Sequence, residues 1–360
     1  MNGTHPRIHM GAPCLDSVES DSVFAQVSSG WISQGPRTKE FEQLICSSLN
    51  VRYAVAMSNG TATLHSMLLA LNVGVGDYVV VPSLTYISTV NVIYLCGATP
   101  IYVDVDPETL TVDYADVELA LKTYQAKVLL SVDLKGLPCD YDALNSLCSI
   151  YGCHHLADSA ESLGAIYKRH PVGSQALMHS FSMFANKTIT CGEGGFVTTN
   201  DESLYSKLIC IRNQGQGINR YEHIMFGCNY RFTDVKAAIA IPQLSKLDGI
   251  MKKRSSVTSS IINELSPSLV LQKVPTYVDR HPYYCFTVMF TSSELRDEAI
   301  HCFDQRNIEW RISFPPCHLQ PYHSTLPFKC VSQLTHTLHA YSTMLDIPCH
   351  QNLTELEIKK

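Results

Sequence analysis

A turn-prone stretch in the middle of the chain reads Phe181-Ser-Met-Phe-Ala-Asn-Lys-Thr-Ile-Thr-Cys-Gly-Glu-Gly-Gly-Phe196. Its central residue, Lys187, follows a β-rich segment and precedes a cluster of glycines, so it does not lie on a charged helical face. A lysine in such a turn is a candidate nucleophile. The alternative is a solvated surface lysine, which is the usual environment of this residue type. The interpretation of Lys187 therefore depends on partners elsewhere in the sequence.

The composition is that of an ordinary folded protein. The 360 residues are 45% hydrophobic and 17% charged, enough for a large core and about two domains. The net charge of -6 gives no general attraction for nucleic acid or anionic membranes. The sequence has no apolar run of transmembrane length, and its start lacks the apolar core of a signal peptide. The 14 cysteines are irregularly spaced, which favours reduced thiols over disulfides or zinc. We expect a soluble, cytoplasmic protein without a metal, a nucleic-acid partner or a membrane partner.

Strands and helices alternate along most of the chain. This alternation predicts an α/β fold with a mostly parallel sheet covered on both faces. Two further strands, at 177–184 and 195–199, flank the turn that carries Lys187. The other predicted strands lie near 53–57, 76–82, 98–106, 126–132 and 154–158. The helices between them are predicted near 60–71, from after Tyr86 to Ile93, at 117–124 and at 141–151.

The chain divides into three predicted parts. Residues 1–30 show little periodicity and are interpreted as an N-terminal arm that packs on another element. Residues 31–247 form a large domain, which begins with a helix capped by Thr38 and with Phe41, Leu44 and Ile45 on one face. From residue 248 a long helix and shorter mixed segments predict a smaller C-terminal α+β domain over 248–360.

Three features are candidate partners of Lys187. A strand, a Ser-Asn-Gly turn and a helix start place the backbone N–H groups of residues 60–62 where a phosphate could bind; the alternative is an ordinary connection capped by Asn59 or Thr61. Tyr86 follows a buried strand, at the end where open α/β sheets bind ligands. Asp158 closes an apolar strand, where an uncompensated carboxylate is costly, so it needs a cation or a donor unless it caps a helix.

Taken together and in this order, the features fit a pyridoxal 5′-phosphate (PLP) site. The lysine would form an imine with the cofactor aldehyde, and the aspartate would keep the pyridine nitrogen protonated so that the ring accepts electrons. The helix N-terminus would hold the phosphate.

The sequence here resembles the nucleotide-sugar aminotransferases of the DegT/StrS type, which are fold-type I PLP enzymes that include the perosamine synthases. The resemblance runs from about Trp31 to the C-terminus and implies a seven-stranded type of sheet flanked by helices, with a smaller C-terminal α+β domain. The matching segments are Ser58-Asn-Gly-Thr-Ala62, Gly76-Asp77, Pro82-Ser-Leu-Thr-Tyr86, Asp158-Ser-Ala-Glu-Ser-Leu-Gly164, residues 181–195 and Asn229-Tyr-Arg-Phe-Thr-Asp-Val-Lys-Ala-Ala238.

The resemblance implies a role for each matching residue. Lys187 is the Schiff-base lysine and proton shuttle, with a pKa that we expect to be lowered by its setting. The implied cofactor contacts are Asp158 to the pyridine nitrogen, Tyr86 stacked on the ring, Glu161 near the ring, and Thr61, Ala62 and Ser182 at the phosphate. Asn229 matches a residue that reaches the phosphate of the neighbouring subunit, which implies a homodimer with shared active sites. Arg311 and His318 match segments near the sugar site; the alternatives are a surface arginine and a loop histidine.

Three departures from the family pattern stand out. Glu161 occupies a position where many members have glutamine, and its charge could change the hydrogen bonding around the ring. Asp133-Leu-Lys135 replaces the usual His-Leu-Tyr segment, so the local substrate contacts are open. The chain ends at Lys360 within the expected final helix, so we expect a slightly curtailed small domain.

The lysine segment favours one reaction. Related sugar dehydratases have histidine in place of Lys187, and residues 186–195 resemble those of enzymes that act on 4-keto-6-deoxy sugars. The resemblance implies ping-pong transfer of an amino group, through pyridoxamine 5′-phosphate, from L-glutamate or glutamine to a nucleotide-linked 4-keto-6-deoxy sugar. The product would be a perosamine-like sugar nucleotide for surface polysaccharide or glycan biosynthesis. The alternatives are a dehydratase, an aminotransferase for another keto sugar or a cyclitol, and a non-catalytic PLP-bound regulatory protein.

Overall fold

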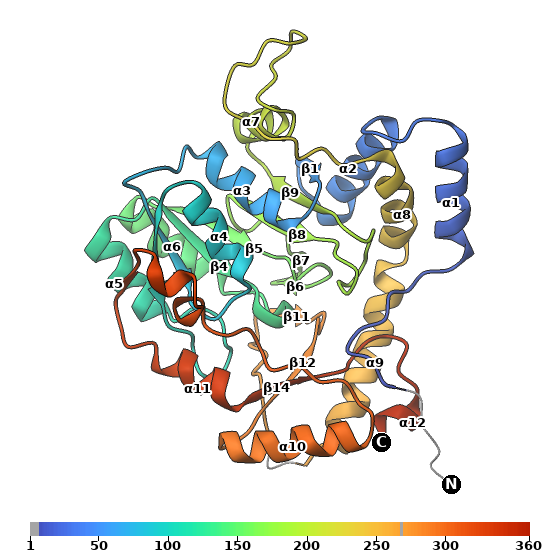
Figure 1. Ribbon diagram of the computed structural model, residues 1–360, viewed down its shortest axis with the longest axis vertical. Coiled ribbons are helices and arrows are strands. Elements are labelled where there is room, and N and C mark those ends of the chain that lie inside the picture. The colour runs from blue at the N-terminus through green and yellow to red at the C-terminus, as the bar shows by residue number, and fades with distance from the viewer. Residues whose placement is uncertain (1–6, 267–268) are drawn as a thin grey trace.

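A mixed sheet forms the middle layer of the protein (Figure 1). The computed structural model describes residues 7–266 and 269–360. Within them, the sheet has eight strands in the order β1 (Tyr53–Met57), β9 (Gly195–Thr199), β8 (Met178–Ser182), β5 (His154–Asp158), β4 (Val128–Val132), β2 (Tyr78–Pro82), β3 (Thr99–Val103) and β13 (Lys329–Cys330). β9 is antiparallel to both of its neighbours, and the other pairs are parallel.

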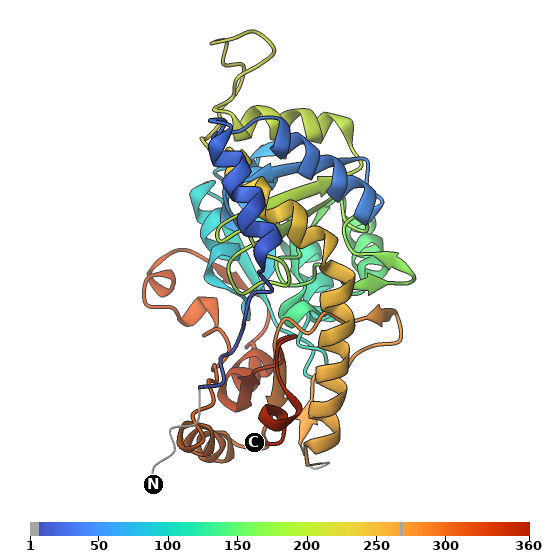
Figure 2. The same cartoon turned by 90° about the vertical axis from the view of Figure 1, so that its right-hand side faces the viewer.

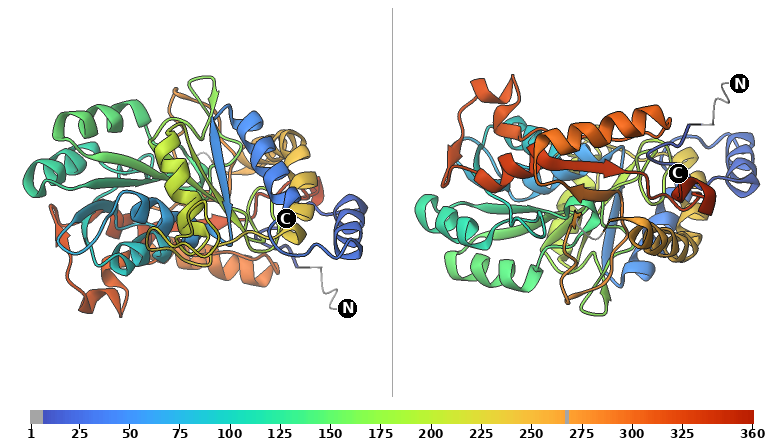
Figure 3. Two further views of the ribbon diagram at one scale, coloured as in Figure 1. Left: turned by 90° about the horizontal axis from the view of Figure 1, so that it is seen from above. Right: turned by 90° about the horizontal axis from the view of Figure 1, so that it is seen from below.

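Helices cover both faces of this sheet (Figure 3). One face packs against α2 (Pro36–Leu49), α5 (Tyr114–Tyr124), α6 (Tyr141–Tyr151) and α8 (Asp234–Ser245), and the other against α3 (Gly60–Ala70), α4 (Ile87–Leu95) and α7 (Glu202–Arg212). Successive side chains of a strand point to opposite faces, so Val80 joins the first core while Val79 and Val81 join the second. Burial on both faces explains why this strand is apolar at every position and not alternately polar.

The N-terminal segment contains a helix that the periodicity did not predict. α1 (Ser17–Ser28) begins with a capping box: the Asp16 side chain accepts the backbone N–H of Glu19, and the Glu19 side chain accepts the backbone N–H of Asp16. The helix packs against α8, and Figure 2 shows the two side by side. Reciprocal capping and packing on α8, rather than a pronounced apolar stripe, account for this helix.

The start of α2 differs in detail from the prediction. Gly35 is the N-cap and Pro36 the first helical residue, whereas the Thr38 hydroxyl donates to Asp234 Oδ1 of α8 at 2.7 Å. Phe41 and Ile45 are fully buried, but Leu44 is 38% exposed. Two expectations were therefore wrong: Thr38 does not cap this helix, and Leu44 does not share the buried face.

The C-terminal part is built on α9 (Leu247–Glu264). A small antiparallel sheet of β10 (Val270–Leu271), β12 (Phe286–Met289) and β14 (Met344–Ile347) packs with it around a separate apolar core. The remaining elements are α10 (Ser293–Gln305), α11 (Thr335–Thr343), α12 (Glu355–Ile358), the 3-10 turns η2 (Cys317–Leu319) and η3 (His323–Thr325), and a sheet of β6 (Ile166–Tyr167), β7 (His170–Pro171) and β11 (Val278–Arg280). Because β13 extends the large sheet and β11 pairs with β6, the C-terminal part contributes strands to all three sheets of the described residues.

The sheet directs several chain segments to one edge. β1, β8, β5, β4 and β2 all run in the same direction, so the segments after them leave from the same end. These segments carry Asn59, Phe184, Ser159, Asp133 and Tyr86. In the described part of the chain, no helix is both long and apolar enough to cross a membrane.

Candidate functional site

A cavity of about 570 Å³ lies at this edge of the sheet. Most of the residues singled out from the sequence line it, although they come from segments far apart in the chain. They are Thr61, Ala62, Tyr86, Asp158, Glu161, Ser182, Lys187 and Arg311. Asn229 and His318 are not among the lining residues that the structure describes.

The helix α3 presents unused donors at one end of the cavity. Asn59 caps the helix: its side-chain Oδ1 accepts the Ala62 N–H at 2.9 Å, and its carbonyl accepts the Thr63 N–H at 3.2 Å. Among the described residues, the N–H groups of Gly60 and Thr61 have no acceptor, as expected for a first helical turn. The cap therefore occupies Ala62 and leaves two backbone donors for an anion.

Ser182 completes this end of the cavity. Its Oγ accepts the Phe184 N–H at 3.3 Å, which leaves the hydroxyl hydrogen available to donate. The chain segments are tightly apposed here, because a Cβ at Gly60 would lie 3.1 Å from Ser182 Cβ and a Cβ at Gly195 would lie 2.9 Å from Gly60 N. Two backbone donors and a hydroxyl at a helix N-terminus fit a phosphate group.

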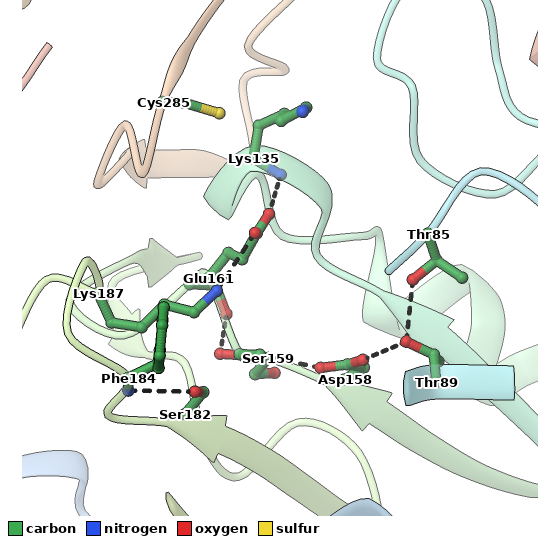
Figure 4. A network of polar contacts seen from close by, with 12 residues as sticks. Thr85, Thr89, Lys135, Asp158, Ser159, Glu161, Ser182, Phe184, Lys187 and Cys285 are labelled. Carbon is green, nitrogen blue, oxygen red and sulfur yellow. Dashed lines mark hydrogen bonds and ion pairs between the residues drawn. The ribbon is translucent and has the colours of Figure 1, made fainter. Parts of the chain in front are cut away.

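Asp158 is a buried carboxylate at the floor of the cavity. Its Oδ2 accepts the Thr89 hydroxyl at 2.7 Å, its Oδ1 accepts the Ala160 N–H at 3.2 Å, and Thr89 in turn contacts Thr85 at 3.0 Å (Figure 4). A turn follows Asp158, not a helix, so the N-cap alternative does not hold. Burial raises the pKa of Asp158 to about 6, although the Thr89 hydrogen bond opposes the rise. A buried carboxylate without an ion pair in the described residues fits a protonated ring nitrogen.

Lys187 and Glu161 point toward each other across the cavity (Figure 4). Lys187 Nζ lies 3.3 Å from Glu161 Oε1 and 4.0 Å from the centre of the Tyr284 ring. Burial alone lowers the pKa of Lys187, but the charge of Glu161 and the nearby Tyr284 outweigh it, so the pKa lies above its ordinary value. The expectation of a lowered pKa for this lysine was therefore wrong for the side chain in this structure. The sequence had no local signal for the position of Tyr284.

The segment Asp133-Leu134-Lys135 is hydrogen-bonded to the segment that carries Asp158 and Glu161. The buried carboxylate of Asp133 accepts hydroxyl hydrogen bonds from Tyr141, Ser159 and Ser162, at 2.6–2.7 Å. The N–H of Lys135 donates to Glu161 Oε2 at 2.8 Å. This turn thus fixes the segment that carries Asp158 and Glu161. Asp133 ends an apolar strand as Asp158 does, and that position was a signal that could have marked it.

Arg311 and Tyr86 lie near the aromatic wall of the cavity. The Arg311 guanidinium lies over Tyr284 and Phe314, with its carbon 5.6 and 5.5 Å from the ring centres. Tyr86 is 57% exposed and packs edge-on against Phe314, with the ring centres 5.3 Å apart. These rings give the cavity a flat apolar side beside its polar floor.

The two remaining candidates lie elsewhere. His318 Nδ1 contacts the Ser83 hydroxyl at 2.7 Å, next to the buried Tyr102. Asn229 is exposed at the returning end of the loop after α7, where it forms a bridge with Asn213. Figures 1 and 2 show this loop projecting away from the rest of the protein. Neither side chain meets the cavity of its own chain.

Comparisons with known proteins agree with this site. The chain is 37% identical over 361 residues to GDP-perosamine synthase from Caulobacter vibrioides, covering 99% of this chain and 96% of the relative. It is 36% identical over 314 residues to GDP-perosamine synthase from Escherichia coli O157:H7, covering 87% and 86%. The solved structure of Spr1654 from Streptococcus pneumoniae in its PLP form is 26% identical, with a TM-score of 0.91 over 98% of this chain and 96% of that one.

The prediction of an α/β fold with a mostly parallel sheet flanked by helices is confirmed by this structural similarity and by the observed sheet. In the residues that the structure describes, the sheet has eight strands and not seven, because the short β13 is added beside β3. The description of the matching family, DegT/DnrJ/EryC1/StrS aminotransferase family, applies to residues 13–360. The chain therefore belongs to the DegT/DnrJ/EryC1/StrS aminotransferase family.

Proposed function

We propose that the chain is a PLP-dependent aminotransferase that moves the amino group of L-glutamate to C4 of a GDP-linked 4-keto-6-deoxy sugar. The product is a 4-amino-4,6-dideoxy sugar nucleotide, a precursor for a surface polysaccharide or glycan. The observation that carries the proposal is the convergence of Lys187, Asp158 and the free donors of α3 on one cavity. The two similar GDP-perosamine synthases support the choice of nucleotide and sugar.

The residues present fit PLP at each end of the cofactor. The N–H groups of Gly60 and Thr61 and the hydroxyl of Ser182 would hold the phosphate. The Asp158 carboxylate would pair with the protonated ring nitrogen, which returns its pKa toward the ordinary range. Tyr86, on the open side of the cavity, would cover the ring. When bound, PLP supplies an electron sink for the electron pair released when a substrate C–H bond breaks.

Lys187 would hold the cofactor aldehyde and carry the proton. Its free amine would serve as the base and acid that moves a proton between the substrate carbon and the C4′ position of the cofactor. Glu161, at 3.3 Å, keeps the amine in the cavity, and the raised pKa of Lys187 favours holding the proton between transfers. Glutamate is the donor in the first half-reaction, and the keto sugar is the acceptor in the second.

We also propose a homodimer with shared active sites. The loop after α7 carries four exposed large apolar side chains, Ile218, Tyr221, Ile224 and Phe226, which a lone chain leaves in water. Asn229 is exposed at the end of the same loop and does not reach its own cavity. It would donate to the phosphate bound by the partner subunit.

Mixing two inactive variants tests the shared site. Lys187→Ala lacks the reactive amine, and Asn229→Ala lacks the contact to the partner. In a mixed dimer, one cavity has Lys187 from one chain and Asn229 from the other, so activity should rise above that of either variant alone. A mixture that stays as inactive as its parts, although subunit exchange is demonstrated by mass, would contradict the shared site.

A visible spectrum tests the function itself. The wild-type holoenzyme should lose the absorption band of its lysine-bound cofactor when glutamate is added, and regain it with a GDP-linked 4-keto-6-deoxy sugar. Lys187→Ala should lose both the band and turnover, while Lys253→Ala, on the exposed face of α9, should retain both. A wild-type protein that responds to neither compound would favour the regulatory alternative, and continued turnover by Lys187→Ala would sink the lysine assignment.

A further inference from the structure

The cavity contains few positive charges for substrates that carry several negative ones. Among the described lining residues, only Lys187 and Arg311 are cations, whereas four are carboxylates: Asp133, Asp158, Glu161 and Glu193. Lys187 is committed to the cofactor in the proposed function. We propose that Arg311 binds a carboxylate of the amino donor, and that a buried Lys135–Asp346 ion pair fixes Arg311 for this role. The inference rests on the proposed function and adds its donor-binding residue.

The guanidinium of Arg311 is held on one side and open on the other. Nε lies 3.4 Å from Asp346 Oδ2, and Nη2 lies 3.6 Å from Cys285 Sγ. No acceptor for Nη1 exists in the part of the chain that the structure describes. The rings of Tyr284 and Phe314 pack against the guanidinium. An arginine with a free edge and a fixed plane is suited to a carboxylate, which it can bind through two parallel hydrogen bonds.

The backbone fixes the position of Arg311 as well. Its N–H donates to the Asp346 carbonyl at 3.1 Å, and the Asp346 N–H donates back to the Arg311 carbonyl at 2.9 Å. Asp346 belongs to β14, so Arg311 is attached directly to the small antiparallel sheet. The side chain can therefore face the cavity without being carried by a free loop.

Lys135 determines how far the Asp346 carboxylate neutralises the charge of Arg311. The Asp346 side chain is fully buried, and its Oδ2 accepts from Lys135 Nζ at 2.6 Å while its Oδ1 accepts the Thr287 hydroxyl at 2.8 Å. Lys135 is also fully buried and donates to Ser313 Oγ at 2.8 Å. Since Lys135 is the nearer cation, it neutralises Asp346 more strongly than Arg311 does. The three groups keep one net positive charge, and Arg311, whose side chain is 30% exposed, is the member that can offer it to a ligand.

The location suits a donor that reacts at Lys187. Lys187 Nζ and the Arg311 guanidinium both lie over the ring of Tyr284, at 4.0 and 5.6 Å from its centre. A carboxylate on Arg311 would therefore lie along the same wall as the reacting amine. The acceptor also carries an anionic group, the pyrophosphate of its nucleotide, so the experiment must separate carboxylate binding from pyrophosphate binding.

Binding of two unreactive probes to the holoenzyme makes that separation. Glutarate is a dicarboxylate without an amine, and GDP has the pyrophosphate and the nucleoside but lacks the keto sugar; both are titrated by calorimetry. Arg311→Met should weaken glutarate binding roughly tenfold to a hundredfold, because a charge-assisted carboxylate contact is lost. The affinity for GDP should change less than about twofold, because GDP has no carboxylate that contacts Arg311. Arg306→Met, which removes an exposed guanidinium at the end of α10, is the matched control and should change neither.

Two further variants test the role of Lys135 as a positioning residue. Lys135→Met should also weaken glutarate binding, because Asp346 then takes the charge of Arg311. Lys135→Met/Asp346→Asn removes both buried charges and should restore much of the binding, a recovery that loss of structure would not produce. Circular dichroism checks that each variant is folded.

Each contrary outcome has a definite meaning. If Arg311→Met weakens GDP more than glutarate, Arg311 recognises pyrophosphate and the proposal is wrong. If it weakens neither, Arg311 binds no anion, and if the double variant binds no better than Lys135→Met, the ion pair does not position Arg311. The proposed function is tested separately: it fails if glutamate does not change the visible spectrum of the wild-type protein.

Discussion

Replacing Asp158 by asparagine should stabilise the cofactor-free protein at neutral pH while weakening its binding of PLP. Burial raises the pKa of this carboxyl from 3.8 to about 6, so the folded protein binds the proton more tightly than the unfolded chain does. The stability of the wild type therefore falls as the pH rises from about 4 to 6 and stays lower above that range. At about 1.4 kcal/mol for each pH unit between the two pKa values, the ionised carboxylate costs about 3 kcal/mol at pH 7.5.

The asparagine variant does not ionise and avoids this cost. In urea unfolding of the apo-protein, Asp158→Asn should exceed the wild type by about 2–3 kcal/mol at pH 7.5 and by about half as much at pH 5. Asp297→Asn removes an exposed carboxylate, 63% accessible, and should show no such dependence on pH. If Asp158→Asn is no more stable than the wild type at pH 7.5, or if its advantage shrinks as the pH rises, the assigned environment of Asp158 is wrong. A cofactor titration should show weaker PLP binding by the same variant.

Two other predictions concern packing around the cavity. Lys135→Met should lower the free energy of unfolding by about 3 kcal/mol, because it leaves Asp346 buried beside a weaker partner, Arg311. Lys135→Met/Asp346→Leu should recover much of that loss. A double variant that is as unstable in urea as the single variant would contradict the pairing. Gly195→Ala should weaken PLP binding and lower the melting temperature, since its Cβ would lie 2.9 Å from Gly60 N. Gly249→Ala, in α9 and with nothing within 4 Å, should leave PLP binding unchanged and should not lower the melting temperature, because alanine is the better helix former. An equal loss of PLP binding and of melting temperature in the two variants would refute the steric argument.

The sequence predicted those parts of the fold and site that leave a local signal. Buried parallel strands are apolar throughout, so the strands and the helices between them could be placed; the helix Tyr141–Tyr151 has the predicted bounds. Asp158 could be identified because a carboxylate at the end of an apolar strand requires a partner. Lys187 could be identified because its turn lies among glycines, and the structure brings both residues to one cavity.

Contacts between distant segments left no such signal. Lys135 and Asp346 are 211 positions apart, and neither the charge of the lysine nor the strand around the aspartate shows that they meet. The raised pKa of Lys187 likewise depends on the distance to Glu161, which only the folded chain determines. The helix α1 was missed because its stability comes from a capping box and from packing on α8. Tertiary context decides such features, whereas periodicity decides the buried strands.

Incorporation of labelled nitrogen tests the central claim most directly. The purified holoenzyme is incubated with L-[15N]glutamate and a GDP-linked 4-keto-6-deoxy sugar, and the sugar nucleotide is analysed by mass spectrometry and NMR. The account predicts a 4-amino-4,6-dideoxy sugar nucleotide that carries 15N at C4, together with 2-oxoglutarate, and no product from Lys187→Ala. An unlabelled deoxygenated product, an amine at another carbon, or unchanged substrate with a fully loaded enzyme would contradict it.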